Sequence, residues 1–146
     1  MSRASPSLNA KIALWILVAL VAFVAATSAA LAQGGAGVPA TQSSNLQGVT
    51  VKATLKPPGL SESRWEISIV LDTHSGDIGD DLVQSASLTT ADGRTLKPLA
   101  WVGAGPGGHH REGVLAFDVA APRPTSVELR IQRPGEAAPR TFRWQP

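Results

Sequence analysis

Residues 49–55 read VTVKATL, and residues 65–71 read WEISIVL. In both stretches apolar side chains alternate with polar ones, and successive side chains of an extended strand point to opposite sides of a sheet. Each stretch therefore predicts a β-strand with one buried and one exposed face. Pro57, Pro58 and Gly59 lie between the two stretches and indicate a chain reversal.

The same alternation continues to the C-terminus. It predicts further strands over residues 82–88, 96–101, 115–119, 127–131 and 142–144, and no window shows helical spacing. Asp92-Gly93 favours a tight hairpin, because glycine readily adopts the positive φ that such turns need. About seven short strands predict an all-β domain, an antiparallel immunoglobulin-like β-sandwich. Its core is expected to contain the aromatic side chains Trp65, Trp101, Phe117, Phe142 and Trp144.

The N-terminal part has a different composition. Arg3 and Lys11 are basic, residues 12–26 are apolar without a charge, and Ala30-Leu31-Ala32 matches a signal-peptidase site. We expect residues 1–32 to form a secretory signal helix, which makes the protein periplasmic or secreted. An uncleaved membrane anchor is the alternative, because residues 12–32 are long enough to cross a bilayer.

Residues 33–47 are rich in Gly, Ala, Ser and Gln, and predict a flexible linker before a domain over residues 48–146. The chain has 13 Lys and Arg against 11 Asp and Glu, and two of the bases are Arg3 and Lys11 in the export segment. The remainder is neutral, which disfavours nucleic-acid binding. There is no cysteine, so neither disulfides nor thiolate ligands are available. Membrane contact is expected only through the export segment.

All three histidines lie in two loops, His74 in one and His109 and His110 in a glycine-rich one. If successive strands are antiparallel, these loops share one end of the sandwich, together with the turn that carries Glu136. Imidazole and carboxylate groups together suit Zn²⁺ or Cu²⁺. The candidate metal ligands are His74, His109 and His110, with Asp77, Asp80 or Asp81 as a fourth.

Other interpretations remain open. Adjacent residues of extended chain point to opposite faces, so only one of His109 and His110 is expected to face His74. The histidines can instead hold the loops in shape, or the same end can contact a protein partner in the cell envelope. Calcium binding by the aspartates is a weaker alternative, since their spacing differs from that of an EF-hand.

No pattern indicates catalysis. The glycine-rich residues 103–108 lack the Lys-Ser/Thr of a phosphate-binding loop, and Pro106 removes an amide donor. Ser75 and His74 are neighbours in sequence without a nucleophile elbow. We therefore expect a non-enzymatic domain, either a metal-binding one or an accessory interaction module.

Several pieces together resemble an uncharacterised family of small exported bacterial and archaeal β-sandwich domains. The most specific pieces are Thr73-His74 and Gly107-Gly108-His109-His110, followed by Trp101 and the final Phe142-Arg143-Trp144. The resemblance covers nearly the whole predicted domain and implies its boundaries, not an activity. A looser, purely architectural similarity links it to small periplasmic copper-binding sandwiches.

Overall fold

The computed structural model describes residues 40–56, 58 and 62–146. The predicted signal helix or anchor over residues 1–32, and residues 33–39 of the predicted linker, lie outside these described residues. Within the described part of the chain, no helix is both long enough and apolar enough to cross a membrane.

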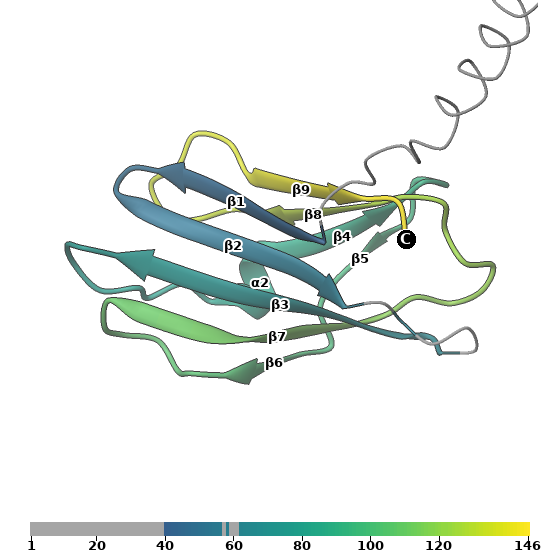
Figure 1. Cartoon of the computed structure of the whole chain (residues 1–146), viewed down its shortest axis with the longest axis horizontal. Helices are drawn as coiled ribbons and strands as arrows, with labels where there is room; N and C mark the ends of the chain where they lie inside the picture. Colours follow the sequence, from purple (N-terminus) through teal and green to yellow (C-terminus); the bar gives the residue numbers. More distant parts are fainter. Residues whose placement is uncertain (1–39, 57, 59–61) are drawn as a thin grey trace, which may run out of the picture. The chain divides into compact units, whose positions relative to one another are not determined.

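The described chain is an all-β fold of two antiparallel sheets (Figure 1), as the sequence predicts. The five-stranded sheet has the order β1-β2-β3-β7-β6, and the four-stranded sheet has the order β5-β4-β8-β9. The strands are β1 (Thr41–Leu46), β2 (Val49–Lys56), β3 (Arg64–Thr73), β4 (Ala86–Thr90), β5 (Thr95–Leu96), β6 (Ala100–Gly103), β7 (His110–Asp118), β8 (Val127–Ile131) and β9 (Arg140–Trp144).

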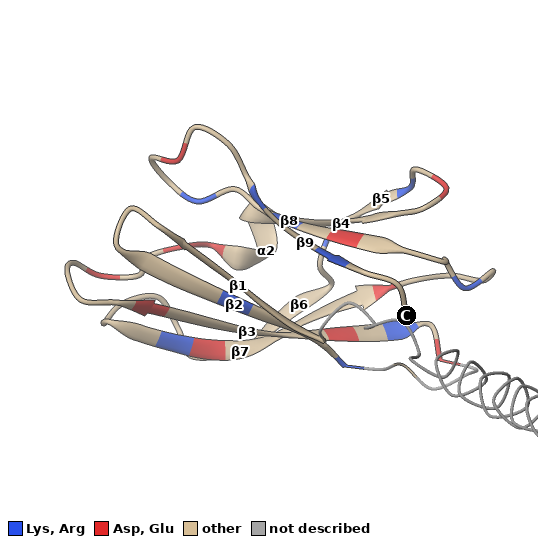
Figure 2. Ribbon diagram, turned by 45° about the horizontal axis from the view of Figure 1, so that its top comes forward, with Lys and Arg blue, Asp and Glu red and all other residues tan. Residues whose placement is uncertain are grey.

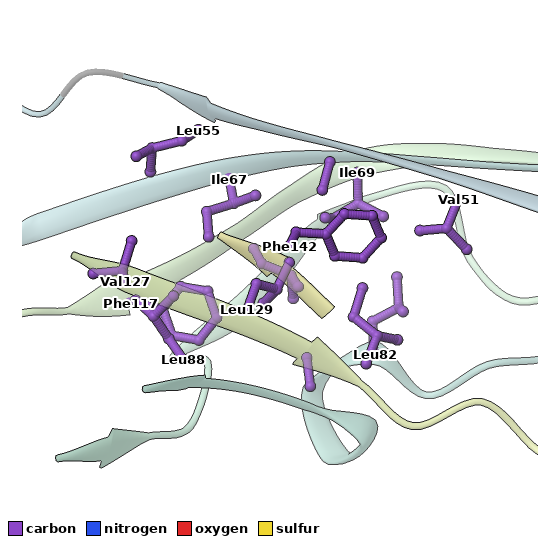
Figure 3. Close-up of a cluster of buried hydrophobic side chains, with 14 of the residues drawn as sticks. Val51, Leu55, Ile67, Ile69, Leu82, Leu88, Phe117, Val127, Leu129 and Phe142 are labelled. Carbon is purple, nitrogen blue, oxygen red and sulfur yellow. The ribbon is translucent and has the colours of Figure 1, made fainter. Parts of the chain in front are cut away.

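The core is formed by the apolar side chains that alternate along these strands. Every second residue of β3 from Trp65 onward is buried, and the intervening residues are partly exposed. Figure 3 shows Ile67 and Ile69 of β3 beside Leu129 of β8 and Phe142 of β9, so both sheets contribute to one cluster. The expected core aromatics Trp65, Phe117, Phe142 and Trp144 are buried, whereas Trp101 is only partly buried against the cluster.

The linker prediction over residues 33–47 is wrong at its C-terminal end. Residues 41–46 form β1, which pairs with β2 from Thr41↔Thr54 to Leu46↔Val49. Gln47 and Gly48 close the hairpin with φ angles of 51° and 73°, the positive values of a two-residue turn. An edge strand with exposed side chains is held by backbone hydrogen bonds and does not require alternating apolar residues. The polar composition of residues 41–46 was therefore wrongly interpreted as a linker.

Two predicted strands also differ from the structure. Residues 82–85 form a single helical turn, α2 (Leu82–Ser85), whose N-terminal amides of Val83 and Gln84 donate to the Asp81 side chain. The strand predicted over residues 96–101 is divided into β5 and β6, which belong to different sheets. The chain thus crosses from one sheet to the other around Pro98, and β6 becomes an edge of the five-stranded sheet.

The opposite edge of the five-stranded sheet, β1, is tied to β9 by side chains. The Gln42 amide donates to the Arg143 carbonyl, and the Arg143 N–H donates to Gln42 Oε1 at 3.1 Å. The Trp144 indole N–H donates to the Ala40 carbonyl at 2.8 Å. The Gln42 side chain therefore forms hydrogen bonds with both the N–H and the carbonyl of Arg143 in β9, as the backbone of a neighbouring strand would.

Candidate functional site

The two histidine-bearing loops meet at one end of the fold, as alternation of strand direction predicts. The Ile78 N–H donates to the Gly108 carbonyl and the Gly107 N–H donates to the Ile78 carbonyl, both at 2.9 Å. The Thr73 N–H donates to the His109 carbonyl, also at 2.9 Å. Gly107 and Gly108 have φ angles of 117° and 73°, which explains why glycines precede the histidine pair.

Of the three histidines, His110 has the most specific surroundings, and it is the first residue of β7 rather than a loop residue as predicted. It lies opposite Asp72 in the β3–β7 register, and its Nδ1 is 2.5 Å from Asp72 Oδ1. Its Nε2 is 3.7 Å from Glu112 Oε2. The hydrogen bond to Asp72 raises the pKa of His110 above its ordinary value, and the charges of Asp72 and Glu112 act in the same direction.

The other predicted metal ligands do not gather around this pair. His74, His109 and Asp77 are exposed loop residues, and Asp81 caps α2. Asp80 is buried, with its carboxylate bound to Arg133. Across the described residues, no set of three or more His, Asp or Glu side chains is close enough to hold a metal ion. The two loops are therefore brought together, but their candidate ligands are not.

Sequence reasoning missed a group of buried charges beneath these loops. The Arg133 guanidinium donates to both carboxylate oxygens of Asp80, at 2.8 and 3.0 Å. Arg111 of β7 donates from Nη1 to the Asp80 carbonyl at 2.6 Å. Asp80 thus joins the first histidine loop to β7 and to the segment after β8.

A second part of this group holds the β1–β2 hairpin. The Arg140 Nε lies 3.1 and 3.0 Å from the two Glu136 carboxylate oxygens, and this pairing lowers the pKa of Glu136. The Arg140 guanidinium also donates to three hairpin carbonyls, those of Ser44, Leu46 and Val49, at 2.8 to 2.9 Å. One buried arginine therefore accounts for much of the attachment of β1.

A usable sequence signal for these arginines existed. Arg111 is in phase with Leu115 and Phe117, and Arg140 is in phase with Phe142 and Trp144, so both side chains lie on the inward faces of their strands. A charge at an inward position requires partners, because an unpaired buried charge is very unfavourable. A basic residue that falls at the same alternate positions as the apolar residues of its strand could therefore have been predicted to be buried and paired with an acidic group.

The remaining notable surface is the edge strand β6. Its sequence, Ala-Trp-Val-Gly, has no charge, and Figure 2 shows it without basic or acidic colour. Val102 is 61% exposed and the preceding Leu99 is 62% exposed. On the same outer face, Val102 pairs with the partly exposed Val114 of β7.

The inner side of β6 is held rigidly. The Trp101 ring lies over Gly113, where an added Cβ would be 2.6 Å from Trp101 Cζ2. The indole N–H donates to the Ala104 carbonyl at 2.9 Å, and the Arg111 guanidinium lies 5.5 Å from the ring centroid. These contacts and the nearby α2 hold the inner side of β6, while Val102 on its outer face stays exposed.

No protein-family model, curated protein or solved structure matches this chain.

Proposed function

We propose that the chain is an exported, non-enzymatic interaction domain that binds an extended segment of an envelope protein along β6. The observation that carries the proposal is the uncharged edge strand with Val102 and Leu99 more than 60% exposed. Edge strands usually carry charges, prolines or bulges that prevent pairing. An edge without them offers backbone donors and acceptors to an added strand.

The charges beside β6 define the partner further. The Ala104 N–H donates to the Glu112 carbonyl, so Glu112 lies next to the C-terminal end of β6. The Glu112 side chain is 71% exposed. Among the described residues its one ion pair is with His110, whose Nε2 lies 3.7 Å from Glu112 Oε2. A complementary segment carries apolar residues at alternate positions, to cover Val102, and a lysine or arginine beyond the C-terminal end of β6, from where its long side chain can approach Glu112.

The fold proposed for this role is immunoglobulin-like. The proposal is supported by the sheet orders: without β1, β2-β3-β7-β6 and β4-β8-β9 follow the orders A-B-E-D and C-F-G of a seven-stranded immunoglobulin sandwich, and β5 is an additional short strand beside β4. In this comparison β1 is an additional strand beside the first one. Export by residues 1–32, with cleavage or retention as an anchor, belongs to the same proposal.

Within this proposal the histidines support the loops. The His109 carbonyl accepts from Thr73, and His110 pairs with Asp72 across two strands. These contacts favour an architectural role because each joins the end of β3 to the start of β7. The end of the fold is thereby kept in one conformation next to β6.

A synthetic peptide tests the binding of an extended segment. We would titrate the full chain, kept soluble in mild detergent, with a peptide of alternating valine and threonine and lysines at both ends. Amide NMR signals of β6 and Val114 are expected to shift and saturate. Val102→Lys should abolish the shifts, and Leu46→Lys, a change at an exposed apolar residue of β1, should not.

Either of two results would overturn the proposal. One is the absence of saturable shifts; the other is shifts that persist unchanged in Val102→Lys. A peptide with glutamates in place of the lysines should bind more weakly, because Glu112 would then face a like charge.

A second candidate function, Zn²⁺ or Cu²⁺ binding, is favoured only by the position of His110 between Asp72 and Glu112. Calorimetric titration of metal-free chain with each ion tests it, with His110→Gln and His74→Gln as variants. Saturable heat that His110→Gln removes would support the site, and heat unaffected by either change would exclude it.

A further inference from the structure

A groove lies on the outer face of the four-stranded sheet, and its lining begins at Asp81, where the loop that carries His74 leads into α2. It has a volume of about 540 Å³ and lies between α2, β4, β8 and the segment after β8. We refer to it as the Lys97 groove. Its polar lining consists of Asp81, Gln84, Ser85, Ser87, Lys97, Arg130 and Gln132.

The first feature of the Lys97 groove is an ammonium group without a carboxylate partner. Lys97 Nζ donates to the carbonyls of Gln84 and Ala86, at 2.9 and 3.3 Å. These two residues flank Ser85, so the ammonium lies beside it. An ammonium can donate three hydrogen bonds, and within the described residues Lys97 donates two. One donor and the full positive charge are left for a ligand.

The second feature is the Ser85 hydroxyl. Among the described residues it is the buried side-chain group that has no hydrogen-bond partner. The backbone around it is fixed, because the Ser85 N–H donates to Asp81 and the Ser85 carbonyl accepts from Gln132. A buried hydroxyl without a partner lowers stability and calls for a physical explanation. Ser85 lines the Lys97 groove, so rotation of its side chain about χ1 would turn the hydroxyl toward an anionic ligand there.

The third feature comes from the neighbouring strand. Ser87 of β4 pairs directly with Arg130 of β8, so a hydroxyl and a guanidinium lie side by side on the outer face. Arg130 donates to Glu128 from Nε, and its terminal nitrogens have no partner in the described structure. Hydrogen-bond donors therefore line the groove from four places. Lys97 follows β5, and the others are Ser85 of α2, Ser87 of β4 and Arg130 of β8.

From this arrangement we propose that the Lys97 groove binds a phosphate group. Two cations and two hydroxyls approach from four places in the fold, which suits the several oxygens of a tetrahedral ligand better than the two coplanar oxygens of a carboxylate. Asp81 also lines the groove, but its Oδ1 accepts from the amides of Val83 and Gln84 at 3.1 and 3.2 Å. These bonds offset part of its repulsion. Inorganic phosphate and the headgroup of a phospholipid share this chemistry.

The test uses amide NMR spectra of the full chain in nonionic detergent, at constant ionic strength. Inorganic phosphate is added to roughly 20 mM, since a small open site is expected to have a Kd in the millimolar range. Saturable shifts should appear at Ser85, Ser87 and Lys97. Lys97→Met should weaken binding about tenfold, through loss of a charge-assisted hydrogen bond. Lys52→Met, a change at an exposed lysine of the other sheet, should leave it unchanged.

Two additional ligands and one variant make the outcome specific. Ser85→Ala should weaken phosphate binding without lowering stability, because it removes a hydroxyl that has no partner in the free protein. If glycerol 3-phosphate binds more tightly than phosphate, the natural ligand is a lipid headgroup. If the two bind equally, it is the free ion. Any of three results would overturn the proposal: acetate binds as tightly as phosphate, the shifts survive Lys97→Met, or the shifts do not saturate. None of these results depends on the peptide experiment at β6.

Discussion

At the scale of single residues, His110 and Asp72 form a pair whose strength depends on pH. Asp72 raises the pKa of His110 in the folded chain, so the pair stabilises the fold fully below the unfolded histidine pKa of about 6.5. This contribution is lost as the pH rises through the higher, folded pKa. The free-energy difference between wild type and His110→Gln in urea unfolding should therefore be larger at about pH 5 than at about pH 9.

NMR titration of the histidine ring protons provides the control. Asp72→Asn removes the acceptor charge and should lower the pKa of His110 relative to the wild type. An unchanged pKa in this variant would show that the pair does not form in solution.

The candidate site was predictable only in part at this scale. Alternation of strand direction correctly placed His74, His109 and His110 at one end, because it depends only on the number of strands between the loops. Ligation depends on where side chains point, and the loop backbone determines that. Asp80 and Asp81 are neighbours, yet Asp80 binds a buried arginine and Asp81 caps a helical turn. No periodicity in a loop distinguishes these two roles.

At the scale of elements, the contact between β6 and β7 depends on Gly113. A Cβ at this position would lie 2.6 Å from Trp101 Cζ2 and 2.7 Å from the Val102 carbonyl oxygen. Gly113→Ala should therefore lower the free energy of unfolding by about 1–3 kcal/mol, the usual effect of overpacking. Urea denaturation measures it.

Gly105→Ala is the matched control, because a Cβ there would meet nothing within 4 Å. Similar denaturation midpoints for the two alanine variants would contradict the close packing of β6 on β7.

Strands β2, β3 and β8 could be predicted because one of their faces is buried and the alternation is visible in sequence. Strand β1 could not, since its side chains are mostly exposed and its stabilisation comes from β2 and Arg140. The separation of β5 from β6 was also hidden, because an alternating pattern is the same whichever sheet a strand joins. Composition and period thus identify buried strands more readily than edges.

At the scale of the whole molecule, the Asp80–Arg133 pair connects segments that are far apart in sequence. The side chains of Asp80 and Arg133 are 1% and 10% exposed, so removing one charge leaves the other buried. Asp80→Asn is expected to cost about 3 kcal/mol of unfolding free energy, measured by urea denaturation. Glu136 at 3.3 Å compensates Arg133 only in part.

Asp81→Asn is the matched comparison at the adjacent position. Asparagine caps a helical turn about as well as aspartate, so this variant should differ from wild type by less than about 0.5 kcal/mol. If both variants unfold at the same urea concentration, the buried pair does not hold this end of the fold together.

The attachment of β1 to β9 by Gln42 limits how molecules of this protein can assemble. Among the described strands of more than two residues, only β6 has a side with no neighbouring strand or bridging side chain. A protein with one available edge is monovalent in strand pairing, because a filament needs a donor edge and an acceptor edge on every subunit. Among these described strands, association along β6 therefore ends with a single occupant, and their arrangement, rather than their charge, disfavours growth of an extended fibre through sheet edges.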